Sequence, residues 1–201
     1  MLTILSPETF KTIPWKNGLG QTTELAINCG GNLDNFDWRL SIASVVSDGD
    51  FSNFSGYQRH LVLVDGEGLI LDHRNGDINE LTNLLDVADF DGGNNTYGRL
   101  VSGSIKDFNI MTNNNSFTAE VNCHVKQHSA NISLLADKLI FAYSLTNEIN
   151  IKHGSRTTAS VPVGHLARLK THHPPESHKQ DSAVISGQHM IIIDLMPLPI
   201  P

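Results

Sequence analysis

The sequence predicts an all-β fold, a barrel or a sandwich with little helix. Short apolar or alternating runs recur along the 201 residues, and turns rich in Gly, Asn and Asp separate them. No long stretch shows the periodicity of an amphipathic helix. A chain of this length can bury one substantial core, so a single compact domain is the default expectation.

The charge balance and the cysteine content limit the classes of partner. Asp and Glu number 21 against 14 Lys and Arg, and the pI is near 5.7. This gives no electrostatic footprint for nucleic acid or an anionic membrane surface. Only two cysteines occur, no signal-peptide pattern is visible, and no apolar run approaches the roughly 20 residues that cross a bilayer. We therefore expect a cytoplasmic protein with no nucleic-acid or membrane partner.

The stretch from Pro14 to Glu24 concentrates polar groups more than any other. Pro14 presets its own φ, and two glycines relax the following turn, which presents Trp15, Lys16 and Asn17. The turn is not a phosphate loop. A dinucleotide fingerprint needs a third Gly where Thr23 stands, and no Gly-Lys-Ser/Thr follows.

Two alternating runs after this turn predict a polar strand face. Thr22 and Glu24 share one side of the first run, and Arg39 and Ser41 share one side of the run from Trp38 to Val46. If the two strands pair as a hairpin, a cation lies opposite an anion. The alternative is an exposed, salt-bridged edge hairpin, in which such a pair contributes at most about 1 kcal/mol.

Three later segments add strands. His60–Val64 and Leu69–Leu71 around Asp65-Gly66-Glu67-Gly68 predict a central hairpin. Ile105 to Met111 places Asp107 and Asn109 together on one strand face. Residues 139–154 weakly echo 60–76 in pattern, which suggests an internal repeat.

The ten histidines do not predict a metal site. His124 and His128 lie four apart in what we expect to be a strand, about 13 Å from each other, too far to share one ion. The run His172-His173-Pro174-Pro175-Glu176-Ser177-His178 offers several ligands, but we expect no functional site there. No nucleophile elbow or activated cysteine is present, so we expect no covalent catalysis, no metal and no cofactor.

Motifs over residues 12–112 closely resemble those of the HutD/Ves family. They are Pro14-Trp15-Lys16-Asn17-Gly18-x-Gly20-x-Thr22-x-Glu24, Trp38-Arg39-x-Ser41-Ile42-Ala43, Asp48-Gly49-x-Phe51-Ser52, Phe54-x-Gly56, Gly66-x-Gly68, Phe90-x-Gly92 and Asp107-Phe108-Asn109-x-Met111. Leu19 departs from the pattern, since the family usually has a third Gly there. Beyond about residue 115 the similarity is only general.

The resemblance implies a cupin-type double barrel, bicupin-like, in one compact chain. The two pseudo-repeated barrels would cover roughly 1–112 and 113–201, with strands free to interleave. Metal-binding cupins carry a His-x-His where this chain has Val62 and Val64, so the resemblance implies a metal-independent protein. The family is associated with histidine utilisation and a formylated glutamate intermediate as ligand, and its Ves branch with stress and cold response.

We therefore hypothesise a sensor or regulator that binds a small anionic metabolite. Lys16 and Arg39 would hold carboxylate oxygens. Glu24 and Asp107 would fix these cations or accept an amide N–H, and Trp15 would wall the pocket. Asn17, Thr22, Ser41 and Asn109 would orient the rest of the ligand.

Two alternatives from other classes remain. One is an enzyme of unknown reaction in stress response, with Glu24 or Asp107 as general base and Lys16 as acid or electrostatic partner. The other is a protein-interaction module, such as a homodimer, that uses exposed Phe51, Phe54 and Tyr57.

Overall fold

The computed structural model confirms the predicted all-β fold. It describes residues 1–15, 20–134, 137–153, 157–170 and 181–199. Within these ranges the only helical element is the short 3-10 turn η1 (Pro7–Thr9), and the sheets are antiparallel. No helix in the described part of the chain has the length and apolar character needed to span a membrane.

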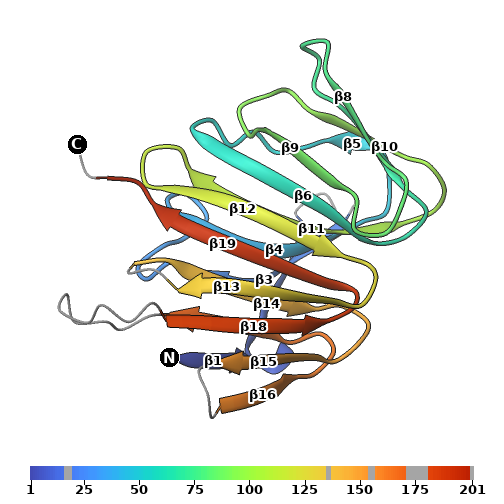
Figure 1. Ribbon diagram of the computed structural model, residues 1–201. Coiled ribbons are helices and arrows are strands. Elements are labelled where there is room, and N and C mark those ends of the chain that lie inside the picture. Colours follow the sequence, from blue (N-terminus) through green and yellow to red (C-terminus); the bar gives the residue numbers. More distant parts are fainter. Residues whose placement is uncertain (16–19, 135–136, 154–156, 171–180, 200–201) are drawn as a thin grey trace. The chain divides into compact units, whose positions relative to one another are not determined.

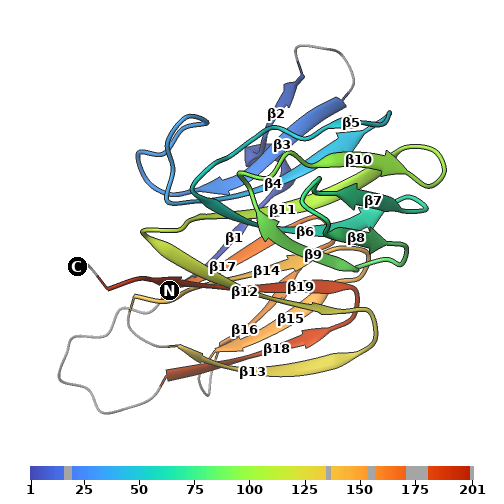
Figure 2. The same cartoon turned by 90° about the horizontal axis from the view of Figure 1, so that it is seen from above.

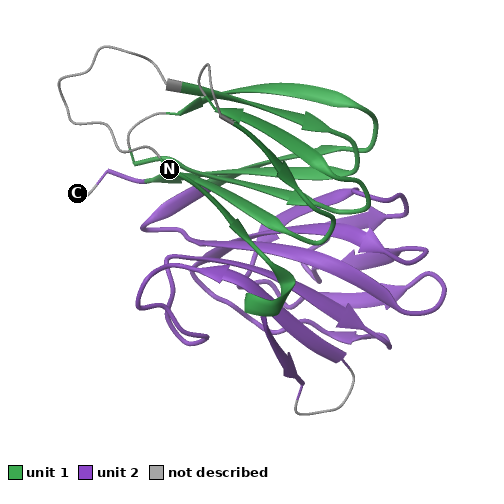
Figure 3. Cartoon of the chain, turned by 90° about the horizontal axis from the view of Figure 1, so that it is seen from below, with its two compact units in different colours: residues 1–9, 119–197 green, residues 10–118, 198–201 purple. Residues whose placement is uncertain are grey.

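The chain forms two compact units, and each is described by itself (Figure 3). Unit 1 comprises Met1–Thr9 and Ala119–Pro197, and unit 2 comprises Phe10–Thr118 and Leu198–Pro201. The first strand of the chain thus belongs with the C-terminal half. It does so because Leu2–Leu5 (β1) pairs along its whole length with Leu166–Lys170 (β17).

Unit 2 contains two sheets (Figure 2). The six-stranded sheet has the order β2-β3-β4-β11-β6-β9, and the four-stranded sheet the order β5-β10-β7-β8. The strands of the larger sheet are, in that order, Lys11–Pro14, Gly20–Ile27, Trp38–Val45, Ile105–Asn113, Tyr57–Asp65 and Val87–Asp91. Those of the smaller sheet are Gly49–Asp50, Tyr97–Leu100, Leu69–Asp72 and Ile78–Leu81.

Unit 1 also contains two sheets (Figure 1). Their orders are β1-β17-β14-β19-β12 and β13-β18-β15-β16. Besides β1 and β17, the five-stranded sheet contains Leu139–Ser144, Met190–Pro197 and Phe117–His124. The four-stranded sheet contains His128–Leu134, Asp181–Gly187, Ile149–His153 and Thr157–Val161.

Each unit has its own apolar core between its two sheets. In unit 2, inward residues of the larger sheet such as Leu61, Leu63 and Ile105 pack with Leu69 and Leu71 of the smaller one. In unit 1, the core is formed by aliphatic residues of both sheets, including Ile140, Ile149, Ile151, Ile185 and Ile192. Burial of these side chains is the main stabilising term of either unit.

The predicted hairpin over 60–71 is wrong. Both strands exist, but β6 pairs with β11 and β9, whereas β7 pairs with β10 and β8. Because both edges of β6 are occupied, the chain must leave its sheet, and Gly66 (φ 97°) and Gly68 (φ 138°) carry it across to the other. The segment 139–154, which resembles 60–76 in pattern, is arranged in the same way, because β14 and β15 also lie in different sheets of unit 1.

Gly66 provides a test of this crossing. A Cβ at Gly66 would lie 2.7 Å from the carbonyl oxygen of Ser104, whereas one at Gly76, with a similar φ of 102°, would meet nothing within 4 Å. We expect Gly66→Ala to lower the free energy of unfolding by about 3 kcal/mol and Gly76→Ala by about 1 kcal/mol, because only the former adds a clash to the unfavourable φ. Urea denaturation of both variants measures the difference. Equal losses would contradict the close approach.

Candidate ligand-binding site

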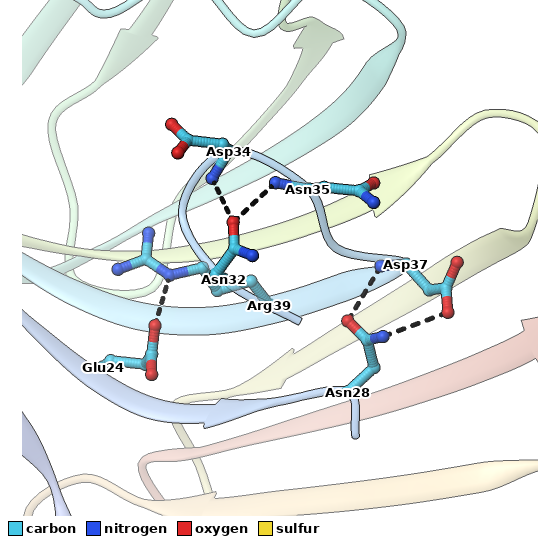
Figure 4. A network of polar contacts seen from close by, with 7 residues as sticks. All are labelled: Glu24, Asn28, Asn32, Asp34, Asn35, Asp37 and Arg39. Carbon is cyan, nitrogen blue, oxygen red and sulfur yellow. Dashed lines mark hydrogen bonds and ion pairs between the residues drawn. The ribbon is translucent and has the colours of Figure 1, made fainter. Parts of the chain in front are cut away.

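The first polar pair lies on the predicted hairpin, which the structure confirms. β3 and β4 pair antiparallel, with Glu24 opposite Ser41 and a bulge between Glu24 and Ala26. Glu24 and Arg39 come from these neighbouring strands and face one another (Figure 4), with the guanidinium Nε donating to Glu24 Oε2 over 2.8 Å. Arg39 is only 5% exposed. This is therefore a nearly buried pair and not a solvated edge contact.

The loop between these strands is held by its own polar side chains (Figure 4). Asn28 accepts from the backbone N–H of Asp37 and donates to its carboxylate. Asn32 Oδ1 accepts from the N–H groups of Asp34 and Asn35. Such Asx turns fix a loop locally without burying it. The loop consequently holds its intervening residues, Leu33 among them, in a defined position.

The second polar group lies on β11 and continues the same face. The register places Asn109 opposite Ser41 on one side and Leu61 on the other, and Met111 opposite both Arg39 and Arg59. Directly opposite residues of antiparallel strands share a face. The predicted polar residues of three strands are thus brought together on one face of the six-stranded sheet.

Arg59, which the sequence analysis missed, is at the centre of this face. Its Nη2 donates to Asn109 Oδ1 over 2.6 Å, and the Asn109 amide in turn donates to Asp107. Its Nη1 donates to the Ser52 carbonyl over 3.4 Å. One sequence signal could have found it, because Arg59 alternates in phase with inward-facing Leu61 and Leu63 on β6.

Aromatic rings surround the Arg59 guanidinium. Its carbon lies 5.5, 5.7 and 5.2 Å from the ring centroids of Phe51, Phe54 and Phe90. Cation–π contact offsets part of the cost of burying the charge. The rings also remove water from the guanidinium, which strengthens its attraction for any anion that enters.

Burial shifts the pKa values of the two central ionisable groups. Desolvation raises the pKa of Asp107 to about 7, against the opposing effects of the Arg59 charge and the Asn109 hydrogen bond. Desolvation, with a further contribution from the Arg39 charge, lowers the pKa of Arg59 to about 10, although Asp107 opposes this shift. At neutral pH Arg59 is therefore charged, and Asp107 is close to half protonated.

Two buried atoms at this point have no hydrogen-bond partner among the described residues. They are Arg59 Nε, a donor, and Asp107 Oδ2. Asp107 is fully buried and Arg59 is 5% exposed. A buried polar atom without a partner costs about 1–3 kcal/mol. Such atoms are rare in native structures, and a polar group that enters the adjoining cavity is one partner that would satisfy them.

A cavity of about 680 Å³ opens onto this polar face. Its polar floor includes Arg39, Arg59, Ser41, Asp107 and Asn109, and its rim includes apolar side chains from β2 and the loops. Its lining consists of Ile13, Pro14, Trp15, Thr22, Leu33, Arg39, Ser41, Ala43, Val45, Ser47, Asp48, Gly49, Asp50, Phe51, Ser52, Phe54, Arg59, Asp107, Asn109 and Met111.

Trp15 is fixed at one side of the cavity. Its indole N–H donates to Thr22 Oγ1 over 2.8 Å. Its ring packs against Gly20, where an added Cβ would lie 2.8 Å from the ring. Trp15 therefore presents its apolar ring, with its single donor already used.

Six of the nine predicted site residues line the cavity: Trp15, Thr22, Arg39, Ser41, Asp107 and Asn109. Glu24 is not a lining residue but fixes Arg39. Lys16 and Asn17 lie outside the described residues. That these residues contact a ligand stays a prediction.

Metal-ligating side chains do not gather in the described part of the chain. It contains no group of three or more His, Cys, Asp or Glu with the geometry to hold a metal ion. The expected separation of His124 and His128 is wrong, because a turn between β12 and β13 brings their rings into a stack with centroids 3.9 Å apart. The histidine-rich run 172–178 lies outside the described residues.

The premise of the interaction-module hypothesis is also wrong. Phe51, Phe54 and Tyr57 are half-buried and not exposed. Phe54 and Tyr57 form an aromatic cluster with Phe36, and Phe51 and Phe54 flank Arg59. These rings therefore serve the unit's own packing.

The fold and the cavity define a class: an antiparallel all-β protein with a charged cavity on one sheet face of unit 2. The model of the HutD family matches residues 7–188. The chain therefore belongs to the HutD family.

Three known proteins are similar to this chain. An uncharacterized 21.2 kDa protein in the hutC 3' region of Pseudomonas putida is 38% identical over 112 residues, 55% of this chain and 57% of that protein. Protein Ves of Escherichia fergusonii is 36% identical over 108 residues, 53% of this chain and 56% of Ves. The chain thus spans little more than half the length of these relatives. The structure of HutD from Pseudomonas fluorescens SBW25 has a TM-score of 0.80 at 24% identity, covering 99% of this chain and 100% of that one, which shows a shared fold.

Asp107 makes stability depend on pH. Its folded pKa of about 7 lies above its ordinary value of 3.8, so between these values the folded protein binds more protons than the unfolded chain. The free energy of unfolding consequently falls as pH rises from about 4 to 7, with a contribution that approaches about 1.4 kcal/mol per pH unit. We expect Asp107→Asn to remove this contribution.

The measurement is urea denaturation of both proteins from pH 4.5 to 8. Groups distant from Asp107 cancel in the difference between the two profiles. Parallel profiles would show that Asp107 titrates as an ordinary carboxylate.

Proposed function

We propose that the cavity of unit 2 binds a small carboxylate without a metal, and that the protein acts as a sensor or regulator. The observation that carries the proposal is the pair of nearly buried guanidiniums, Arg39 and Arg59, in one cavity lining, with Arg59 Nε unpartnered. Guanidinium groups are the side chains best suited to bind carboxylates, because their planar donors match the two oxygens.

The internal carboxyl groups leave part of this positive charge available. Glu24 is bound to Arg39. Asp107 is the acidic group whose charge acts on Arg59, but its raised pKa makes it a weak counter-ion at neutral pH. A ligand carboxylate would complete the donors of Arg59, and protonated Asp107 could donate to it or, when ionised, accept an amide N–H. Asn109, Ser41 and Thr22 would orient the remaining groups.

A formylated glutamate intermediate of histidine utilisation is the first candidate ligand. The chain belongs to the HutD family, and a relative from Pseudomonas putida is named for its position in the hutC 3' region. Such a molecule has carboxylates for the guanidiniums and an amide N–H for a carboxyl acceptor. These features suit the floor of the cavity.

The test is a thermal-shift and calorimetric titration with N-formyl-L-glutamate and related metabolites. Ligand at about 100 times its Kd should stabilise the native protein by roughly 2.7 kcal/mol. We expect Arg59→Lys to raise Kd at least about 30-fold, since Lys keeps the charge but loses the fork of donors. Arg39→Lys is the second variant, in case the first folds poorly.

Arg99→Lys is the matched control, because Arg99 is exposed and does not line the cavity. It should bind as the native protein does. Absence of any stabilisation by small carboxylates, or equal binding by all three variants, would disprove the proposed site.

An acid/base enzyme is the second candidate, and one observation favours it. A carboxyl group with a pKa of about 7 beside a cavity is suited to proton transfer at neutral pH. Asp107 is better placed for this than Glu24, which is bound to Arg39. Turnover of a bound metabolite that disappears in Asp107→Asn while binding persists would favour the enzyme. Binding with no turnover by the native protein would favour the sensor.

A further inference from the structure

Besides its charged floor, the cavity has large apolar lining residues that a small dicarboxylate bound at the floor would leave uncovered. We propose that the ligand class of this site is a carboxylate that carries an apolar or aromatic substituent, with the carboxylate on the floor and the substituent at the rim. This inference rests on the proposed function for the place of the carboxylate. It adds the chemistry of the other end of the molecule.

The size of the cavity is the first argument. Its volume of about 680 Å³ lies in the middle of the range for cavities that enclose drug-sized ligands. A formylated amino acid has roughly a dozen non-hydrogen atoms and would occupy a small part of it. The remaining space extends from the charged floor toward the rim.

The character of the rim is the second argument. Ile13 of β2 and Leu33 of the β3–β4 loop line the cavity, although they are 45% and 48% exposed. Trp15 adds an indole whose N–H is already bound to Thr22. Large apolar side chains that gather at one mouth and are not covered by the chain are typical of a binding surface.

The polar side chains at the rim are largely satisfied within the chain, and this is the third argument. Asp48 accepts from the backbone N–H of Leu100 over 2.8 Å, and Asp50 pairs with Arg74 over 2.8 Å. Among the lining residues, unpartnered buried atoms are Arg59 Nε and Asp107 Oδ2 on the floor, and Ser47 Oγ. Two of the three buried lining atoms without a partner therefore lie at the floor, and partly uncovered apolar side chains lie at the rim.

The rim is also preformed. The hydrogen bonds of Asn28 and Asn32 hold the loop that carries Leu33 (Figure 4), and the bond to Thr22 holds Trp15. A ligand substituent would therefore gain apolar contact without ordering these segments first, which is the condition for efficient binding.

The experiment is isothermal titration calorimetry with N-acyl-L-glutamates that share one head group: formyl, acetyl, butyryl, hexanoyl and benzoyl. We expect Kd to fall about fourfold for each added methylene until the substituent passes the rim. We expect Ile13→Ser and Leu33→Ser to flatten this series, measured on each variant as the ratio of every Kd to that of N-formyl-L-glutamate. Ile78→Ser, at a residue of β8 that is 56% exposed and outside the cavity, should reproduce the native series.

The outcomes separate the inference from the function on which it rests. A Kd that stays constant or rises with chain length, while N-formyl-L-glutamate binds through Arg59, would overturn the inference and leave the proposed function standing. A dependence of Kd on acyl chain length that is equally steep in the rim variants and in Ile78→Ser would also overturn it. If no member of the series binds, the proposed carboxylate site fails, and the inference fails with it.

Discussion

The burial of the Arg59 guanidinium is the constraint on which the cavity depends. A charge this far from water is tolerable only if partners surround it, because desolvation costs several kcal/mol. The chain supplies Asn109 as acceptor and three phenylalanine rings as apolar neighbours. Asn109 and Phe90 are strand residues of the larger sheet, and Phe51 and Phe54 come from the segment between β5 and β6. The polar half of the sheet face is thus organised around one cation.

Alternation alone predicted the strands and much of the site. The pattern of Thr22, Glu24, Arg39 and Ser41 gave a hairpin with an ion pair on one face, and the structure has both. The spacing of Asp107 and Asn109 gave their common face. These predictions succeed because the alternation of side chains along a strand is a local property that can be read from the sequence. The bulge near Glu24 was not predicted, because no glycine or other turn residue marks it.

Non-local pairing explains the failures. Two apolar strands around a Gly-rich turn usually form a hairpin. Here β6 enters a different sheet from β7, because its edges are already occupied by β9 and β11, and no short-range signal reports this. Arg59 was not predicted for the same reason. Its hydrogen bond to Asn109 and its contact with the Phe90 ring both depend on the register of β6 with its neighbouring strands. The stacked His124 and His128 likewise depend on where a turn begins.

The charge pattern of the floor favours the binding of an anion over the binding of a metal cation. Two guanidiniums in one cavity lining repel a cation and attract an anion. Glu24 balances Arg39, but Asp107 is shifted toward its neutral form by the same burial that isolates Arg59. A fully ionised Asp107 would neutralise Arg59 internally and leave little attraction for a ligand. A carboxyl poised near neutral pH instead keeps its hydrogen bond with Asn109 and compensates the positive charge of Arg59 only in part, so an entering carboxylate would complete the balance.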